Sequence, residues 1–211
     1  MIRQKDRMEI LAHRGWWERP QDQNTLQCLG RALAAGHGIE TDIRDRLGEL
    51  VISHDPPDSD ATVFSELLDM VGQNTSLLAL NIKSDGLAPI LASRNLSYSG
   101  KNIVFFDMSV PDMRGYLEHG LPVLTRHSDV EPTPAYYESA KGVWLDALVH
   151  PWATSKTIDQ HLNADKIVAV VSEEIHNRSR DDQWELLYKF RNCDNVSLCT
   201  DLVEEAVSYF C

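Results

Sequence analysis

Residues 11–57 read LAHRGWWERPQDQNTLQCLGRALAAGHGIETDIRDRLGELVISHDPP, and their pattern is strand, helix, strand, turn and strand. The run that ends at Ala12 and the run 39–44 are apolar enough for buried strands. A helix is predicted between them over 25–35, with Gly36 just beyond its end. Gly48 then turns the chain into a short hairpin extension over 49–53.

The same alternation of short apolar runs and helical stretches continues along the chain. Eight runs read as strands, at 9–12, 39–44, 77–83, 103–107, 122–126, 142–148, 167–172 and 196–201. Further helices are predicted over 63–71, 87–94, 110–119, 182–190 and 202–210. Because most of these runs are continuously apolar rather than alternating, we expect strands buried on both faces. The sequence therefore predicts an α/β protein with the (β/α)8 TIM-barrel fold and short loops, as a single compact domain over residues 1–211.

Composition limits the class of partner. The chain has 211 residues, of which 43% are hydrophobic and 25% charged, which is ordinary for a globular domain. Lys and Arg total 20 against 32 for Asp and Glu, and no basic run occurs, so the formal charge is -12. These charges argue against nucleic acid as the partner. An anionic small molecule would need a bound cation and a few Lys or Arg side chains to overcome the repulsion.

No segment of the sequence resembles a targeting or membrane-spanning element. The first nine residues are charged without a following apolar stretch of signal-peptide length, and no run approaches the roughly 20 apolar residues of a membrane span. We therefore expect a soluble, cytoplasmic protein without a transmembrane segment. The sequence does not determine its oligomeric state.

Two acids lie within one predicted strand. In Ile39-Glu40-Thr41-Asp42-Ile43, Glu40 and Asp42 are two residues apart, so their side chains point to the same side of an extended chain. Unpaired carboxylates are costly in a buried strand. Either one divalent cation is held by both acids, or they belong to an ion-pair network with Lys83 and no metal.

Polar residues gather where predicted strands end. They are Arg14, Asp42, Lys83, Asp107, Arg126, Asp146, Glu173 and Asp201. Barrel enzymes have their catalytic residues at the carboxyl ends of the strands. Charged residues also flank buried strands for a simpler reason, because they cannot enter them. His13 and His54 are candidates for proton transfer, because histidine titrates near neutrality. Four other histidines lack a partner pattern and are expected at the surface: His127, His150, His161 and His176.

Four segments together resemble the amino-terminal signature of the glycerophosphodiester phosphodiesterase family, of the PI-PLC-like phosphodiesterase superfamily. They are AHRG at 12–15, NTL at 24–26, IETDIR at 39–44 and SHDP at 53–56. LNIK at 80–83 and CTD at 199–201 agree with later family segments more loosely. The resemblance implies a barrel that hydrolyses phosphodiesters with one divalent cation, Mg²⁺ or Ca²⁺, and a place in lipid metabolism.

The resemblance also implies roles for single residues. Glu40 and Asp42 would bind the metal, His13 and His54 would act as general base and general acid, and Arg14 and Lys83 would neutralise the phosphate. Carboxylate oxygens suit Mg²⁺ and Ca²⁺, and a cation on a phosphate oxygen stabilises charge in the transition state. Trp144 is a further candidate for substrate contact, with ordinary packing as the alternative.

Three features depart from the family pattern. Asn81 replaces the third metal-binding carboxylate, and its amide oxygen can coordinate a hard cation without adding charge; Asp107 could supply the missing charge. Only 22 residues, 56–77, separate Asp55 from Leu78 in the third predicted strand, so the usual family insertion is missing, as in the sphingomyelinase D type of barrel. Gln23 stands where the family has Glu.

Two functions remain open. The first is a metal-dependent phosphodiesterase acting on a glycerophosphodiester or a related small or lipid-derived phosphodiester, with attack by water or by a neighbouring hydroxyl that would give a cyclic phosphate. The second is a catalytically degenerate barrel that binds a phosphorylated ligand or a partner without turnover. Asn81 is the residue that keeps the second possibility open.

Overall fold

A computed structural model describes residues 7–94 and 102–211 of the chain. Its internal contacts form two compact units. Unit 1 comprises Met1–Leu11 and Thr125–Cys211, and unit 2 comprises Ala12–Leu124. The expectation of one domain over residues 1–211 stays a prediction.

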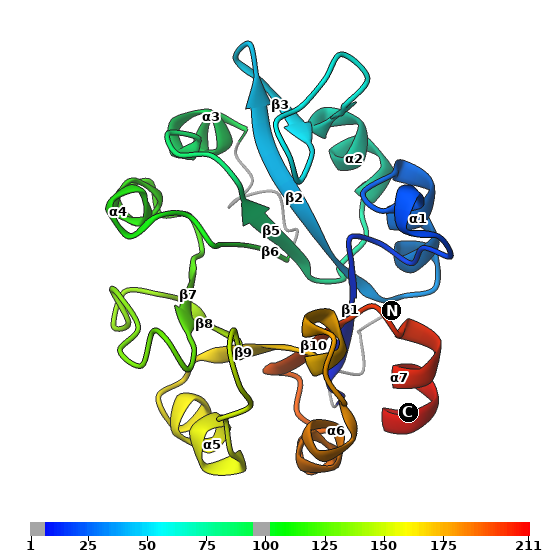
Figure 1. The fold of residues 1–211 in the computed structure, drawn as a ribbon. Helices are drawn as coiled ribbons and strands as arrows, with labels where there is room; N and C mark the ends of the chain where they lie inside the picture. The colour runs from blue at the N-terminus through cyan, green and yellow to red at the C-terminus, as the bar shows by residue number, and fades with distance from the viewer. Residues whose placement is uncertain (1–6, 95–101) are drawn as a thin grey trace. The chain divides into compact units, whose positions relative to one another are not determined.

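Unit 2 contains residues 12–57, for which the sequence predicts strand, helix, strand, turn and strand. Its elements, after the end of β1 (Glu9–His13), are η1 (Pro20–Asp22), α1 (Leu26–Ala34), β2 (Gly38–Arg46), β3 (Glu49–Ile52), β4 (Thr62–Val63), α2 (Phe64–Val71), β5 (Leu78–Ile82), α3 (Ala88–Ser93), β6 (Ile103–Phe106) and α4 (Val110–Glu118). In Figure 1 they run from blue to green. The predicted extension over 49–53 is β3, which pairs antiparallel with β2.

The register of unit 2 determines which polar residues are neighbours. Strand β5 pairs in parallel with β2 on one side and with β6 on the other. Asp42 of β2 is the register partner of Asn81 of β5, and Glu40 is the partner of Ala79. Because parallel strands end at the same edge, Asp42, Asn81 and Lys83 are brought to one edge of the sheet.

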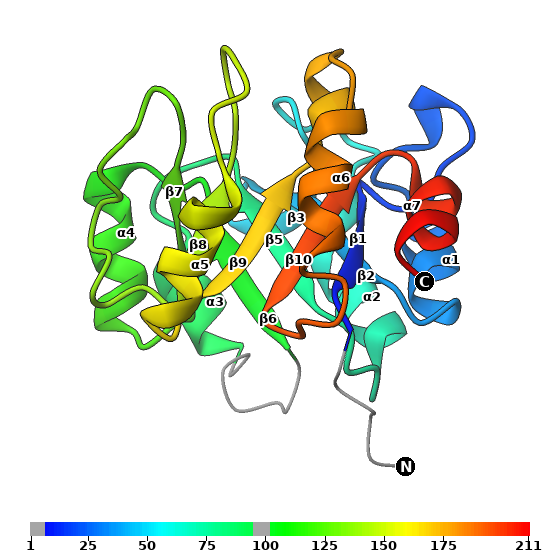
Figure 2. The same ribbon diagram turned by 90° about the horizontal axis from the view of Figure 1, so that it is seen from below.

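Unit 1 consists of strands alternating with helices. Besides the start of β1, its elements are β7 (Leu124–His127), β8 (Gly142–Leu145), α5 (Ser155–Asn163), β9 (Ile167–Val171), η3 (Glu173–His176), α6 (Asp181–Tyr188), β10 (Val196–Thr200) and α7 (Val203–Phe210). The strand order is β1-β10-β9-β8-β7, and β9 pairs in parallel with β8 and β10. Helix α5 packs against β9, as Figure 2 shows.

The strand predictions agree with the structure, and one helix was missed. All eight predicted runs contain strands, and strands such as β5 and β10 are buried along their whole length. Helix α5 has only Ile158 and His161 buried, too weak an apolar pattern for detection from periodicity. The signal that was present is the cap: Thr154 and Thr157 form a capping box at its start. None of the helices in the described ranges is long and apolar enough to cross a membrane.

The expectation of surface positions for four histidines is wrong for His161, which is 6% exposed. Its Nδ1 lies 2.9 Å from the Tyr137 hydroxyl, and its Nε2 lies 2.9 Å from Nδ1 of His127. Burial lowers the pKa of His161 to about 4, and His127 beside it acts in the same direction. These side chains link the loop after β7 to α5. His150, by contrast, is exposed as expected.

Candidate active site

A tight turn after β1 positions the first two candidate residues. Arg14 has φ +55° and Gly15 φ +91°, and the Gly15 N–H donates to the Ala12 carbonyl over 3.1 Å. A Cβ at Gly15 would lie 2.8 Å from the carbonyl carbon of Cys28 in α1, so only glycine fits. The His-Arg-Gly sequence therefore lets α1 approach β1 closely and turns Arg14 back toward the sheet.

Asn24 closes this loop on the acidic strand. Its N–H donates to the Arg14 carbonyl over 2.8 Å, and its φ of +60° is a conformation that Asn tolerates better than most residues. The side-chain amide donates to Asp42 Oδ2 over 2.8 Å, and its oxygen accepts from the Thr41 hydroxyl over 2.8 Å. Sequence reasoning noted Asn24 within a motif but assigned it no contact.

Glu40 and Asp42 are both buried, 1% and 0% exposed. The backbone N–H of Arg14 donates to Glu40 Oε2 over 3.1 Å. The Nε2 atom of His13 lies 3.9 Å from the same oxygen. The end of β1 thus supplies both a backbone donor and an imidazole to the first acid of the pair.

Two cations reach the second acid. Arg14 Nε lies 3.2 Å from Asp42 Oδ2, and Lys83 Nζ lies 3.3 Å from Asp42 Oδ1. Lys83 follows β5, and its N–H donates to the Ile43 carbonyl, which holds it beside β2. The Gln23 side chain accepts from Arg14 Nη1 over 3.3 Å, so this residue orients the guanidinium without adding charge.

The two acids repel each other inside the protein. Burial raises the pKa of Glu40 to about 7, and the charge of Asp42 acts in the same direction. His13, Arg14 and Lys83 oppose this rise in the pKa without cancelling it. A carboxyl group with such a pKa is poised between its charged and neutral forms near neutral pH, and added positive charge would favour the charged form.

The side chains at this edge suit a hard divalent cation. Asn81 is 8% exposed and is adjacent to Asp42 in register. Among the described residues, Asn81 Oδ1 and Asp42 Oδ1 are buried oxygens without a hydrogen-bond partner. No cluster of three His, Cys, Asp or Glu side chains suited to a metal occurs in the described ranges, so a third oxygen ligand at this edge would have to be the Asn81 amide. Oxygen ligands of this kind fit Mg²⁺ or Ca²⁺ better than softer metals.

His54 belongs to the loop after β3, next to the strand β2 that carries Glu40 and Asp42. It follows β3, where the Ser53 N–H donates to the Asp42 carbonyl and the His54 carbonyl accepts from Arg44 Nε over 3.0 Å. Its side chain is 43% exposed, and Nδ1 lies 3.1 Å from a carboxylate oxygen of Asp55. This contact of the His54 ring is therefore with an exposed acid of its own loop.

Two further candidates are Asp107 and Trp144. Asp107 directly follows β6 and is half-buried, with φ +65°. Trp144 belongs to β8 of unit 1 and is 4% exposed. Its burial is what packing in a strand requires, and its role in substrate contact stays a prediction.

Solved structures with similar folds include two phosphodiesterases. A glycerophosphodiester phosphodiesterase from Agrobacterium tumefaciens matches with a TM-score of 0.66 and 16% identity, covering 96% of this chain and 98% of that one. A glycerophosphoryl diester phosphodiesterase from Parabacteroides distasonis matches with a TM-score of 0.67 and 14% identity, covering 97% and 87%. The chain has the fold of these phosphodiesterases. The predicted fold class, α/β of the (β/α)8 TIM-barrel type, is thereby confirmed.

A third solved structure is similar in fold but has a lower TM-score. A dihydropteroate synthetase matches with a TM-score of 0.51 and 13% identity, covering 98% of this chain and 93% of that one. No family model matches the sequence, and no curated protein matches it. With identities this low, the phosphodiesterase fold is established by structure, while the chemistry has to be argued from the side chains.

Proposed function

We propose that this chain is a metal-dependent phosphodiester hydrolase acting on a glycerophosphodiester or a related small or lipid-derived phosphodiester. One observation carries the proposal. Glu40 and Asp42, two buried acids, are surrounded by His13, Arg14 and Lys83 in a chain with the fold of glycerophosphodiester phosphodiesterases. Acids, an imidazole and two cations are the groups that phosphodiester hydrolysis uses.

Glu40, Asp42 and Asn81 would hold one Mg²⁺ or Ca²⁺. The bound cation supplies Lewis-acid stabilisation of the negative charge that develops on the phosphate oxygens. Support comes from the carboxyl group of Glu40, whose pKa is raised to about 7, and from the unpartnered oxygen of Asn81. Both are destabilising features that a dication would relieve.

His13 and His54 would exchange protons with the attacking oxygen and the leaving alkoxide. Glu40 lies within 3.9 Å of His13 Nε2 and stabilises the protonated imidazole. In His54 the contact with Asp55 engages Nδ1, so Nε2 remains for proton transfer. Since the His54 side chain is 43% exposed, a substrate can reach it without rearrangement of the core.

Arg14 and Lys83 would bind the phosphate. They bring two positive charges to a protein whose formal charge is -12, and both are within ion-pair distance of Asp42. Asp42 keeps the two cations together before a substrate arrives.

The test is hydrolysis of bis-p-nitrophenyl phosphate, followed by a panel of glycerophosphodiesters and lysolipids, each with Mg²⁺, Ca²⁺ or EDTA. We expect turnover that requires a divalent cation and that His13→Ala and His54→Ala each reduce by about 10²- to 10⁴-fold. The matched control is His119→Ala, because His119 is the C-cap residue of α4 and does not belong to the cluster around Glu40 and Asp42. Turnover unaffected by EDTA and by both substitutions would contradict the proposal.

A second candidate function is binding of a phosphorylated ligand without turnover. The observation that favours it is the charge balance at Asp42, whose two oxygens face Arg14 and Lys83. In the same assay this function predicts no hydrolysis with either metal, together with ligand affinity that falls in Lys83→Met.

A further inference from the structure

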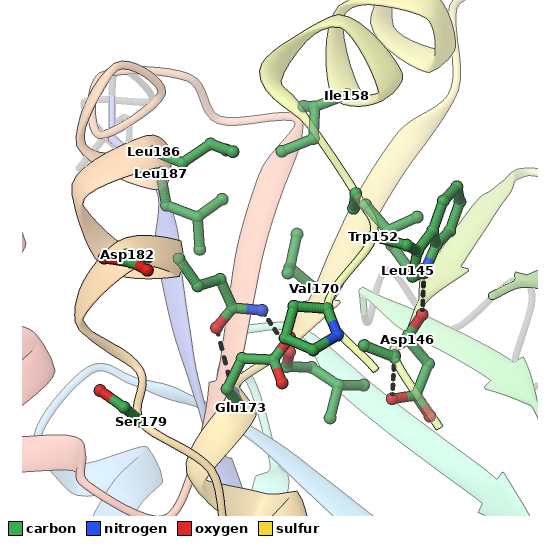
Figure 3. A pocket seen from close by; sticks show the side chains of 15 residues that line it. Leu145, Asp146, Trp152, Ile158, Val170, Glu173, Ser179, Asp182, Leu186 and Leu187 are labelled. Atoms are coloured by element: carbon green, nitrogen blue, oxygen red, sulfur yellow. Dashed lines mark hydrogen bonds between the residues drawn. The ribbon is translucent and has the colours of Figure 1, made fainter. Parts of the chain in front are cut away.

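A cavity of about 170 Å³ lies in unit 1. It is enclosed by the ends of β8 and β9 and by helices α5 and α6, as Figure 3 shows. Its walls are mainly apolar, formed by Leu145, Trp152, Ile158, Val170, Leu186 and Leu187. An apolar cavity of roughly 150 Å³ in another protein stays dry and binds benzene, so this one has room for a ring of that size.

The polar atoms in the wall are largely engaged with the protein. The Gln183 amide donates to the Val171 carbonyl over 2.9 Å, and its oxygen accepts from the Glu173 N–H over 3.1 Å. The Trp152 indole N–H donates to the Asp146 carbonyl over 2.7 Å. Because these groups already have partners, they do not require water in the cavity, and an apolar group can fill it without leaving them unsatisfied.

The charged side chains that line the cavity are all acidic. Asp146, Glu173 and Asp182 line it, and no Lys or Arg side chain does so among the described residues. Glu173 is paired with Arg178, and Asp146 lies 2.7 Å from Nε2 of His176. Asp182 is exposed in the first turn of α6 and therefore remains available to a ligand.

We propose that this cavity is a binding site for a small organic cation, a primary amine attached to an apolar group about as large as a benzene ring. The apolar group occupies the space between α5 and α6, and the ammonium group lies at the acidic edge near Asp182. Anionic ligands are disfavoured by the three acids in the lining. The site belongs to unit 1 and does not depend on the proposed phosphodiesterase activity.

The first test is an NMR titration of the full chain with benzylamine, benzyl alcohol and phenylacetate. We expect benzylamine, which is protonated at neutral pH, to bind about two- to fivefold more tightly than the alcohol, and phenylacetate to bind least. Ala153→Phe places a ring at the partly exposed edge of the lining and should abolish binding, while an unchanged melting temperature shows that the variant is folded. No binding of benzylamine, or equal binding to Ala153→Phe, overturns the site.

A pair of charge variants separates the ionic contribution from general effects. Asp182→Asn should remove the preference for benzylamine over benzyl alcohol without changing affinity for the alcohol. Glu185→Gln alters the net charge equally, and Glu185 is an exposed acid on the same helix outside the cavity lining. Equal losses in both variants, or no preference for the amine in the unsubstituted chain, overturn the assignment of a cationic ligand.

Discussion

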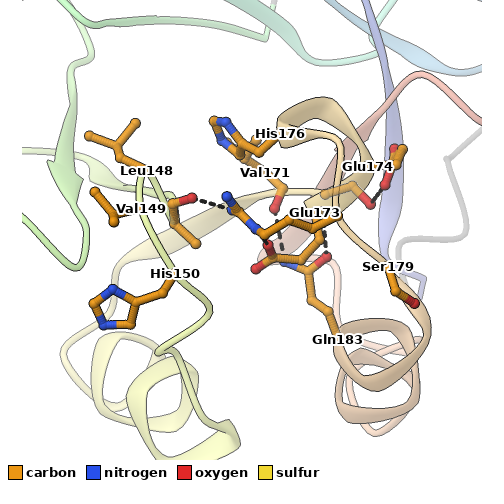
Figure 4. A network of polar contacts seen from close by, with 12 residues as sticks. Leu148, Val149, His150, Val171, Glu173, Glu174, His176, Ser179 and Gln183 are labelled. Carbon is orange, nitrogen blue, oxygen red and sulfur yellow. Dashed lines mark hydrogen bonds and ion pairs between the residues drawn. The ribbon is translucent and has the colours of Figure 1, made fainter.

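Glu40 and Asp42 of unit 2 can be compared with Glu173 and Glu174 of unit 1. The first two acids lie within β2, which pairs in parallel with β5, and the other two follow the end of the parallel strand β9. In unit 1, Glu173 pairs with Arg178, whose Nη2 also donates to the Ala147 carbonyl. Figure 4 shows Glu173 and Glu174 within this polar network. Glu174 accepts from Ser172, Thr200 and the Asp201 N–H, so both of its oxygens are engaged. These acids join the end of β9 to neighbouring segments of unit 1.

The acids of unit 2 are less completely compensated. Burial and Asp42 together raise the pKa of Glu40 to about 7, and in the described part of the chain Asn81 Oδ1 has no hydrogen-bond partner. Buried polar groups are normally satisfied, and exceptions concentrate where a ligand or ion completes the set. Buried carboxylates whose oxygens all have hydrogen-bond or ion-pair donors therefore indicate a structural role. A buried acid pair with too few donors indicates a binding site.

The largest effect should follow from removing the charge of Asp42. Asp42→Asn keeps the shape of the side chain but takes away the proposed metal ligand and the counter-ion of Arg14 and Lys83, so we expect activity to fall at least about 100-fold. Excess divalent cation should restore part of it. Asp45→Asn, an exposed acid in the same strand, is the control and should retain activity. Equal activity of the two variants in the phosphodiesterase assay would remove Asp42 from the site.

In unit 1 the corresponding substitution should affect stability instead. Glu173→Gln leaves Arg178 without its carboxylate, and we expect the free energy of unfolding to fall by about 1–3 kcal/mol in urea titrations. Phosphodiesterase activity of the folded variant should persist. Glu185→Gln, exposed on α6, should leave stability nearly unchanged. If Glu173→Gln were as stable as that control, the ion pair between Glu173 and Arg178 would not contribute to the stability of unit 1.

Sequence reasoning could predict the strands and the acidic pair because both depend on local patterns. Apolar runs identify buried strands, and acids two apart in a strand share a face whatever the fold. The contact of Asn24 with Asp42 depends on a backbone reversal over the loop after β1, and periodicity carries no signal for it. The burial of His161 was missed for a related reason, since its partners Tyr137 and His127 come from another segment.

Asn81→Glu should sharpen the comparison by adding the charge that unit 2 lacks. We expect the affinity for Mg²⁺ or Ca²⁺, measured by calorimetry, to rise about tenfold, because a third carboxylate would face the cation beside Asp42. Without metal, the added buried charge should lower stability. Asn102→Glu places an acid just before β6, at the other end of the parallel strands, and serves as the control. Unchanged metal affinity in Asn81→Glu would mean that residue 81 does not face the cation.

The smallest expected effect is a pH dependence confined to Glu40. Since its pKa is raised from 4.5 to about 7 in the folded protein, the fold binds an extra proton between these values, and stability falls as pH rises through that window. Glu40→Gln abolishes this dependence. In EDTA the variant should therefore gain stability over the unsubstituted chain at pH 8 but not at pH 4, by of the order of 1 kcal/mol, or about 2–4 °C in Tm. Adding Mg²⁺ or Ca²⁺ should reverse the order at pH 8, because only the charged glutamate gains from the cation. The contrary result would be a stability difference between Glu40→Gln and the unsubstituted chain that is the same at pH 4 and pH 8, with and without metal. Glu40 would then be a fully compensated acid like Glu173.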